Sequence, residues 1–136
     1  LPVTVGGTQP MIRVGDSSGV YSSGSKYAFK TDISNEGNTN YSASRSQGAN
    51  MWEGGTVGGD TGEGFGGLFY LYNPSDTTMQ PIIGGTGTGI SGGNEVLTCN
   101  IHGMFSQVIN LDRVQFAFIS GNVESGRMTV WGIAHV

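Results

Sequence analysis

The sequence is short of cysteine, of charge and of long apolar runs. Only 12% of its 136 residues are charged, and no apolar stretch approaches the roughly 18 residues that would suggest a membrane span. A single cysteine, Cys99, cannot close a disulfide within the chain, so we expect a buried and unreactive thiol there. The first ten residues lack the basic and apolar regions of a secretory signal. The sequence therefore predicts neither membrane insertion nor a disulfide framework.

Positive charge is especially scarce. Six Lys and Arg residues stand against ten Asp and Glu residues, which gives a net charge of −4. So few bases can neutralise only a few phosphates, and nucleic-acid binding is not expected.

Metal-ligating patterns are also missing. One Cys and two distant His residues give no zinc spacing. Asp60 with Glu63, or Asp16 with the serines after it, could offer oxygen atoms to calcium, but the EF-hand spacing is absent. We therefore expect solvated loop acids, and no metal or other cofactor.

Small residues fill the place of the missing charged ones. The chain has 25 Gly, and Gly, Ser, Thr and Asn together make up 60 of its residues. Because Gly costs about 1 kcal/mol relative to Ala in a helix interior, a helix-rich fold is excluded. Low charge and 10% aromatic residues argue against a disordered chain. One all-β domain over residues 1–136 is predicted.

Alternation of apolar and polar residues predicts eight or nine short strands, and the densest signals lie after residue 64. In residues 95–105, for example, Leu97, Cys99 and Ile101 fall on one face. The candidate strands are residues 1–5, 11–14, 26–34, 49–54, 68–72 (with its exit turn at 73–76), 79–83, 95–105, 113–120 and 127–136. Frequent turn signals between them indicate an antiparallel β-sandwich, for which a jelly roll is the expected architecture.

The last two candidate strands predict a hairpin. Residues 113–120 and 127–136 both alternate, and the interval between them contains two Gly and an Asn. We expect the two strands to pair in antiparallel fashion. The side chains expected to bury most area there are Phe116, Phe118, Val130 and Trp131.

Two glycine-rich tracts occupy residues 54–67 and 84–93. Ordering them costs backbone entropy, so we expect a neighbouring subunit or a ligand to hold them. The second tract matches G-x-G-x-x-G at residues 87–92 and G-x-S-x-G around Ser91. Both motifs act at a strand-to-helix turn, and no helical pattern follows, so we interpret both as chance matches.

No catalytic constellation is assembled in the sequence. His102 as base with Asp112 as orienting acid could in principle serve a triad, but His102 alternates within a candidate strand and His135 lies beside the end of the sequence. A glycosidase would need two carboxylates across a cleft, and the sequence does not place any pair. We expect no enzymatic activity.

Aromatic residues in the polar, glycine-rich first half form the candidate interface or ligand surface. Tyr and Trp are favoured at interfaces because they bury a large area and keep a polar tip. Plugging the ends of the sandwich is an equally good interpretation, and carbohydrate binding would use the same residue types. The candidate residues are Tyr21, Tyr27, Tyr41, Trp52 and Phe65.

The second half of the chain resembles a known class of proteins. GFGGLFYLYNPSD at residues 64–76, followed by a Gly-rich interval and VQFAFISGNVESGRMTVWGI at residues 114–133, is similar to small tailed-bacteriophage virion proteins. Those proteins end in a Phe-rich strand, a Gly-Asn-x-x-Ser-Gly loop and a strand closing on Gly-Ile. This chain departs from them at Trp131, where Tyr or Phe is more usual, and in the three residues after Ile133.

The resemblance implies a non-enzymatic structural protein on the surface of the virion. A tail-fibre or spike head that binds the host and assembles as a homotrimer is the first expectation, and a capsid decoration protein is the alternative. The expected partners are other copies of the chain, other virion proteins and a host surface glycan. A lectin-like carbohydrate-binding domain is the competing class, because its composition would be the same.

Overall fold

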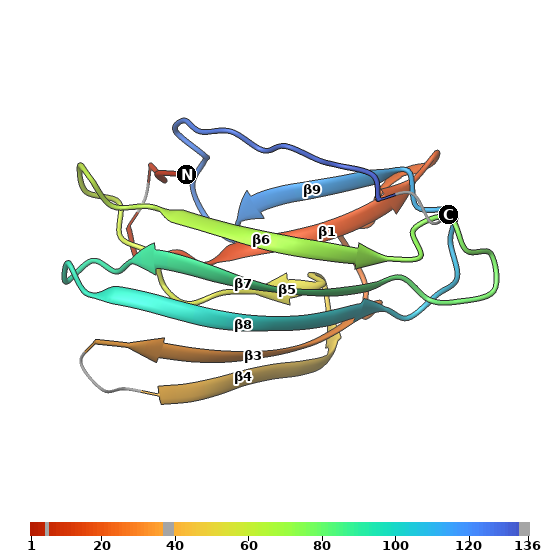
Figure 1. Ribbon diagram of the computed structural model, residues 1–136, viewed down its shortest axis with the longest axis horizontal. Helices are drawn as coiled ribbons and strands as arrows, with labels where there is room; N and C mark the ends of the chain where they lie inside the picture. Colours follow the sequence, from red (N-terminus) through yellow and green to blue (C-terminus); the bar gives the residue numbers. More distant parts are fainter. Residues whose placement is uncertain (5, 37–39, 134–136) are drawn as a thin grey trace.

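Two antiparallel sheets pack face to face in the computed structural model (Figure 1), which describes residues 1–4, 6–36 and 40–133. Within those ranges the side chains of residues 40, 41, 43–47, 52 and 53 are not described. The antiparallel β-sandwich predicted from the sequence is confirmed. No helix capable of crossing a bilayer occurs in the described ranges.

The larger sheet has five strands, and every neighbouring pair in it is antiparallel. Its central strand is β8, which pairs along nearly its whole length with β3 on one side and β7 on the other. In spatial order the strands are β4 (Asn40–Gly48), β3 (Tyr27–Asn35), β8 (Val96–Phe105), β7 (Ile82–Ile90) and β6 (Phe65–Tyr72).

The smaller sheet is built around β1 (Pro10–Asp16), which pairs with β9 (Arg113–Phe118) over six positions. The short strand β2 (Gly19–Val20) pairs with the end of β1, and the short strand β5 (Trp52–Glu53) pairs with its beginning. In the order of the sequence, the pair formed by β3 and β8 is enclosed by the pair formed by β1 and β9. The first part of the chain thus folds back onto the second part.

The core lies between the sheets and follows the two-residue period of the strands. On β8 the predicted set Leu97, Cys99 and Ile101 is buried, and the residues between them are exposed, which confirms the predicted alternation. Tyr27 on β3 is fully buried. Its hydroxyl accepts a hydrogen bond from the backbone N–H of Val14 on β1 at 3.1 Å. Because β3 and β1 belong to different sheets, this hydrogen bond links the two sheets across the core.

The predicted C-terminal hairpin is wrong over the described residues. Strand β9 exists, with Phe118 buried and Phe116 half-buried, but its partner is β1. Residues 127–133 form no strand, and residues 134–136 lie outside the described part of the chain. Val130 and Trp131, expected in the core, are 73% and 74% exposed. Alternation indicates a strand-forming pattern but does not specify a pairing partner, and here β1 takes that place.

The glycine-rich tract at residues 84–93 is ordered by its own chain, because most of it is the interior strand β7. Glycine is required there by close packing. A Cβ atom on Gly87 would lie 2.2 Å from Cζ of Phe65 and 3.2 Å from Sγ of Cys99. The ring of Phe65 therefore rests directly on the β7 backbone, which corrects the expectation that a subunit or ligand holds this tract.

The other glycine-rich tract, residues 54–67, is also held within the chain. Val57 forms a bridge with Thr8, and the Gly58 N–H donates to the Ile90 carbonyl at 3.0 Å. The end of this tract enters β6. Among the weaker predictions, residues 1–5 contribute only a single bridge at Val3 in the described part of the chain, and β4 was missed because its sequence is almost entirely polar.

Candidate assembly interface

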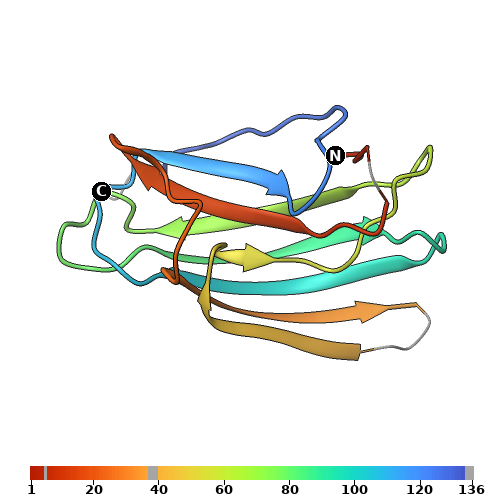
Figure 2. The ribbon, with the colours of Figure 1, turned by 180° about the vertical axis from the view of Figure 1, so that it is seen from behind.

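One side of the sandwich carries two unpaired sheet edges, β6 and β9. Among the described residues, β6 pairs only with β7, and β9 only with β1. The rings of Phe65 and Phe69 on β6 lie 6.1 and 6.3 Å from the ring of Phe116 on β9, so the two strands face each other across the core. In Figures 1 and 2 the chain turns back after β9 and runs along this same side.

Strand β6 has none of the usual protection of an edge strand. Its sequence, FGGLFYLY, contains no charged residue and no proline, and it spans eight residues. Proteins usually block such edges with Lys, Pro or a bulge, because free N–H and C=O groups invite another strand. Its outward side chains Leu68, Tyr70 and Tyr72 are about half exposed. Leu1 closes only the first position of this edge, where it exchanges two backbone hydrogen bonds with Phe65 at 2.6 and 3.1 Å. Over residues 66–72, and among the described residues, strand β6 is an open template for strand addition.

The apolar surface continues from β6 onto the neighbouring strands. Tyr72 lies opposite Ile82, and Ile82 lies opposite Met104, so the three form one row across the outer face. A Cβ atom on Gly84 would be 3.5 Å from the ring of Tyr72, which indicates that the ring leans over β7. We call Leu68, Tyr70, Tyr72 and Ile82 the outer patch.

Residues 127–133, which we call the C-terminal segment, have no partner in the described part of the chain. They form no hydrogen bond there. Their large apolar side chains are Met128, Val130, Trp131 and Ile133, all between 58% and 74% exposed. Monomeric proteins rarely expose such a contiguous apolar stretch. The segment is the most conspicuous unpartnered feature of the described structure.

The chain just before the C-terminal segment is anchored. The Thr4 N–H donates to the Asn122 carbonyl at 3.1 Å, and the Glu124 N–H donates to the Pro2 carbonyl at 3.0 Å. Gly126 lies against the side chain of Leu1, since a Cβ atom there would overlap it. These contacts hold the chain up to residue 126 on the sandwich and leave the segment beyond it free.

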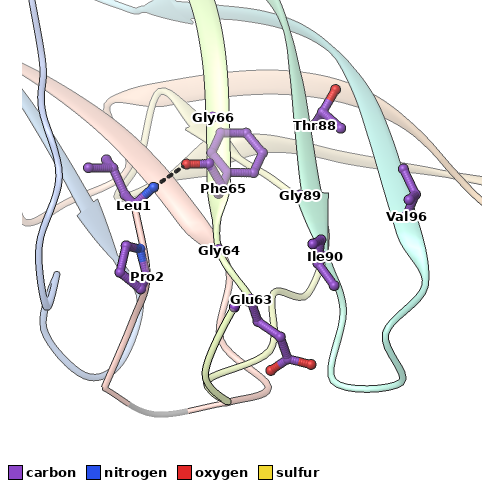
Figure 3. Close-up of a pocket in the computed structure, with 11 residues that line it drawn as sticks. Leu1, Pro2, Glu63, Gly64, Phe65, Gly66, Thr88, Gly89, Ile90 and Val96 are labelled. Atoms are coloured by element: carbon purple, nitrogen blue, oxygen red, sulfur yellow. Dashed lines mark hydrogen bonds between the residues drawn. The ribbon is translucent and has the colours of Figure 1, made fainter.

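A shallow hollow of about 480 Å³ lies where β6 begins, beside the N-terminal residues (Figure 3). The Leu1 ammonium donates to the Phe65 carbonyl at 2.6 Å on one wall. The Glu63 carboxylate accepts from the Asp60 N–H at 2.6 Å and is directed away from Leu1 in the close-up. Apart from the Leu1 ammonium, Glu63 and Thr88, the lining is glycine backbone and apolar side chains.

Two of the predicted interface residues belong to the core of the single chain. Tyr27 is fully buried, and Phe65 is 3% exposed and packs on Gly87. Neither can complete a core between subunits, so this part of the expectation is corrected. The physical reason is the two-residue period of β3 and β6, which directs both rings toward the core, where the missing side chain of Gly87 leaves room for the ring of Phe65.

Tyr21 is half-buried and engaged within the chain. Its ring stacks on Phe105 at 4.9 Å, and the Lys26 ammonium lies 4.5 Å from its ring centre. Its hydroxyl donates to the Asp16 carboxylate at 2.8 Å. The side chains of Tyr41 and Trp52, the remaining two candidates, lie outside the described residues.

The Asp16 carboxylate, a candidate calcium ligand in the sequence, caps the turn after β1. It accepts from the Ser18 hydroxyl at 2.5 Å and from the Ser18 N–H at 2.9 Å. These bonds, together with the one from Tyr21, lower the pKa of the Asp16 carboxyl to about 2. The described residues contain no cluster of three or more His, Cys, Asp or Glu side chains that could hold a metal ion.

The residues of the chance catalytic motifs lie apart. Ser91 lies in the turn between β7 and β8. His102 lies six positions along β8, so it is about 20 Å from the end of the strand at which that turn lies. The Asp112 carboxylate accepts from the Arg113 guanidinium at 2.7 Å, near the beginning of β9. Residues 87–92 continue β7 into a turn rather than opening a helix. Cys99 is buried as expected, and burial raises the pKa of its thiol to about 11.

Sequence reasoning overlooked the β6 edge, although a signal was present. Residues 68–72 are apolar or aromatic at every position, so both faces of the strand are apolar. A strand with two apolar faces needs cover on both sides, and the sandwich supplies only one.

No protein-family model, curated protein or solved structure matches the chain.

Proposed function

We propose that this chain is a non-enzymatic structural protein exposed on a bacteriophage particle, where it assembles with copies of itself. A tail-fibre or spike head that contacts the host is the first assignment, with a homotrimer as its expected form. A capsid decoration protein is the alternative, because it needs the same self-association and the same stable sandwich. The virion placement depends on the resemblance of the second half of the sequence.

The observation that carries the proposal is the side of the sandwich formed by β6, β9 and the C-terminal segment. It combines an uncharged open edge, a half-exposed outer patch and an unpartnered apolar segment. A freely diffusing monomer with these three features together would be prone to aggregation. A protein that works as a repeated part of a particle covers them in its assembly.

A second function, glycan binding, is favoured by one specific feature. Tyr70 and Tyr72 stand about half exposed on the outer face of β6, and His102 and Asn100 are exposed on β8, further across the same sheet. An aromatic surface flanked by hydrogen-bonding side chains suits a sugar ring, which has apolar and polar sides. This function is compatible with a host-binding fibre head.

The experiment is to locate the chain on virus particles. Gold-labelled antibody raised against the purified chain would be applied to particles released by cells that carry its gene, with particles lacking the gene as the control. Label at the tail tip is expected for a fibre or spike head, and label over the head for a decoration protein. Label on neither, with the chain recovered only in the particle-free fraction, contradicts a virion role.

A further inference from the structure

The C-terminal segment has apolar side chains on both of its faces. By the two-residue period of a strand, Met128 and Val130 would point to one side, and Trp131 and Ile133 to the other. A strand of this kind is stable only where both faces are covered. The edge that receives it must therefore offer apolar neighbours on both sides of its sheet.

Of the two open edges on this side of the sandwich, only β6 meets this requirement. Its inward residues Phe65 and Phe69 belong to or pack against the core, and its outward residues Leu68, Tyr70 and Tyr72 form most of the outer patch. The outward residues of β9 differ.

On β9, only the inward side is apolar, with Phe116 and Phe118 against the core. The outward residues are Arg113, Gln115 and Ala117, which offer little apolar contact. A strand added at β9 would leave one of its own apolar faces in water. Apolar matching on two faces therefore selects β6.

We propose that the C-terminal segment of one copy adds as an edge strand to β6 of a second copy. This inference deepens the proposed self-assembly and depends on it. The lengths agree, since the part of the β6 edge beyond the Leu1 contact, residues 66–72, and the segment both have seven residues. β6 carries no charge that could oppose Arg127 of the segment. Backbone hydrogen bonds would close the open edge. The side chains of the added strand would cover the β6 part of the outer patch, which consists of Leu68, Tyr70 and Tyr72.

The path of the segment in the single chain favours the β6 edge of a second copy over the β6 edge of the same chain. The segment already runs along the side where β6 lies, yet it forms no hydrogen bond with any described residue. Because the segment and the edge are different surfaces, each copy gives a strand to one neighbour and receives one from another. Such head-to-tail contacts form a ring where the rotation between copies closes and an open filament where it does not, and a ring of three is the form of the expected homotrimer.

Cysteine cross-linking between differently tagged chains tests the pairing directly. One chain carries Thr129→Cys or Val130→Cys in the segment, and the other carries Tyr70→Cys on β6. Gln115→Cys on β9 and Ser42→Cys on β4 are the matched edge controls. The native Cys99 is buried, so it does not compete. Sedimentation of the same mixtures, and a circular dichroism spectrum of each variant, show whether the chains are folded and assembled.

The expected result is a disulfide between chains at Tyr70→Cys from only one of the two adjacent segment positions, because neighbouring residues of a strand face opposite sides. A bond to Gln115→Cys instead overturns the choice of β6. A bond that forms only when both cysteines are in one chain overturns the choice of a second copy. Oligomers without any of these bonds overturn this inference and leave the proposed self-assembly intact. Folded monomers at every concentration contradict both.

A charge variant gives an independent readout. Tyr70→Lys places a positive charge on the open edge, where Lys hinders strand addition, and is expected to shift sedimentation to that of the 14.2 kDa single chain. Ser42→Lys places the same charge on the β4 edge and is expected to leave the oligomer unchanged. If both variants sediment as the unmodified chain does, β6 is not the receiving edge.

Discussion

At the scale of the residue, glycine has a role opposite to the one its abundance suggests. Twenty-five glycines in 136 residues indicate long flexible loops, yet several of them lie in β7 beneath aromatic rings. Gly87 is the clearest case, because the ring of Phe65 occupies the place of its side chain. Composition reveals the glycines but not which of them are packed, since that depends on a strand far away in the sequence.

Gly87→Ala is therefore expected to destabilise the fold. Its Cβ would lie 2.2 Å from Cζ of Phe65, and overpacking of this kind costs about 1 to 3 kcal/mol. Gly66→Ala on the outer side of β6 is the matched control, because no atom lies within 4 Å of its Cβ. Urea unfolding measures both variants. Equal stability of the two would contradict the packing of Phe65 on β7.

Asp16 gives a prediction for the dependence of stability on pH. Hydrogen bonds from Ser18 and Tyr21 hold its pKa at about 2 in the folded chain, below the ordinary value of about 3.9 for an aspartate. A carboxyl group with a depressed folded pKa stabilises the fold above its unfolded pKa, and that contribution is lost as the pH falls through the folded pKa. Asp16 therefore stabilises the fold at neutral pH.

Asp16→Asn removes this titration. The difference in unfolding free energy between the unmodified chain and the variant should be largest above about pH 4 and should shrink toward pH 2. Denaturant unfolding at a series of pH values measures it. A difference that stays constant from pH 2 to pH 7 would show that the carboxylate charge plays no part in the turn.

At the scale of the element, strands could be predicted wherever alternation coincided with dense apolar residues. β3, β6, β8 and β9 are found close to their predicted positions for this reason. Pairing could not be predicted, because nothing in residues 113–120 specifies β1 rather than residues 127–136 as the neighbour. β4 is polar and β7 glycine-rich, so their strand character comes from the ladders they join and not from their own sequences.

Phe118 tests the placement of β9. It is 4% exposed and lies in the core cluster, so Phe118→Ala should cost about 3 to 5 kcal/mol. Ile119→Ala, at the next position, removes a side chain that is 49% exposed and should cost only about 1 kcal/mol. Thermal or denaturant unfolding compares them. If the two substitutions cost the same, β9 does not face the core as described.

At the scale of the whole molecule, the surface available for self-assembly differs from the one that the sequence predicted. The sparse aromatic residues of the first half were expected to complete a core between subunits, but Tyr27 and Phe65 complete the core of their own chain. What is left uncovered lies in the second half, where the β6 edge and the C-terminal segment are both apolar and both unpartnered among the described residues. We still expect the chains to associate with one another, but through the β6 edge and the C-terminal segment instead of the aromatic residues of the first half.

The most direct test of this account is sedimentation velocity of the purified chain at micromolar concentration, compared with a chain that ends at residue 126. The account predicts that the full chain sediments as an oligomer of its 14.2 kDa unit and that the shortened chain sediments as a folded monomer. A full chain that sediments as a folded monomer, or a shortened chain that forms the same oligomer, would contradict it.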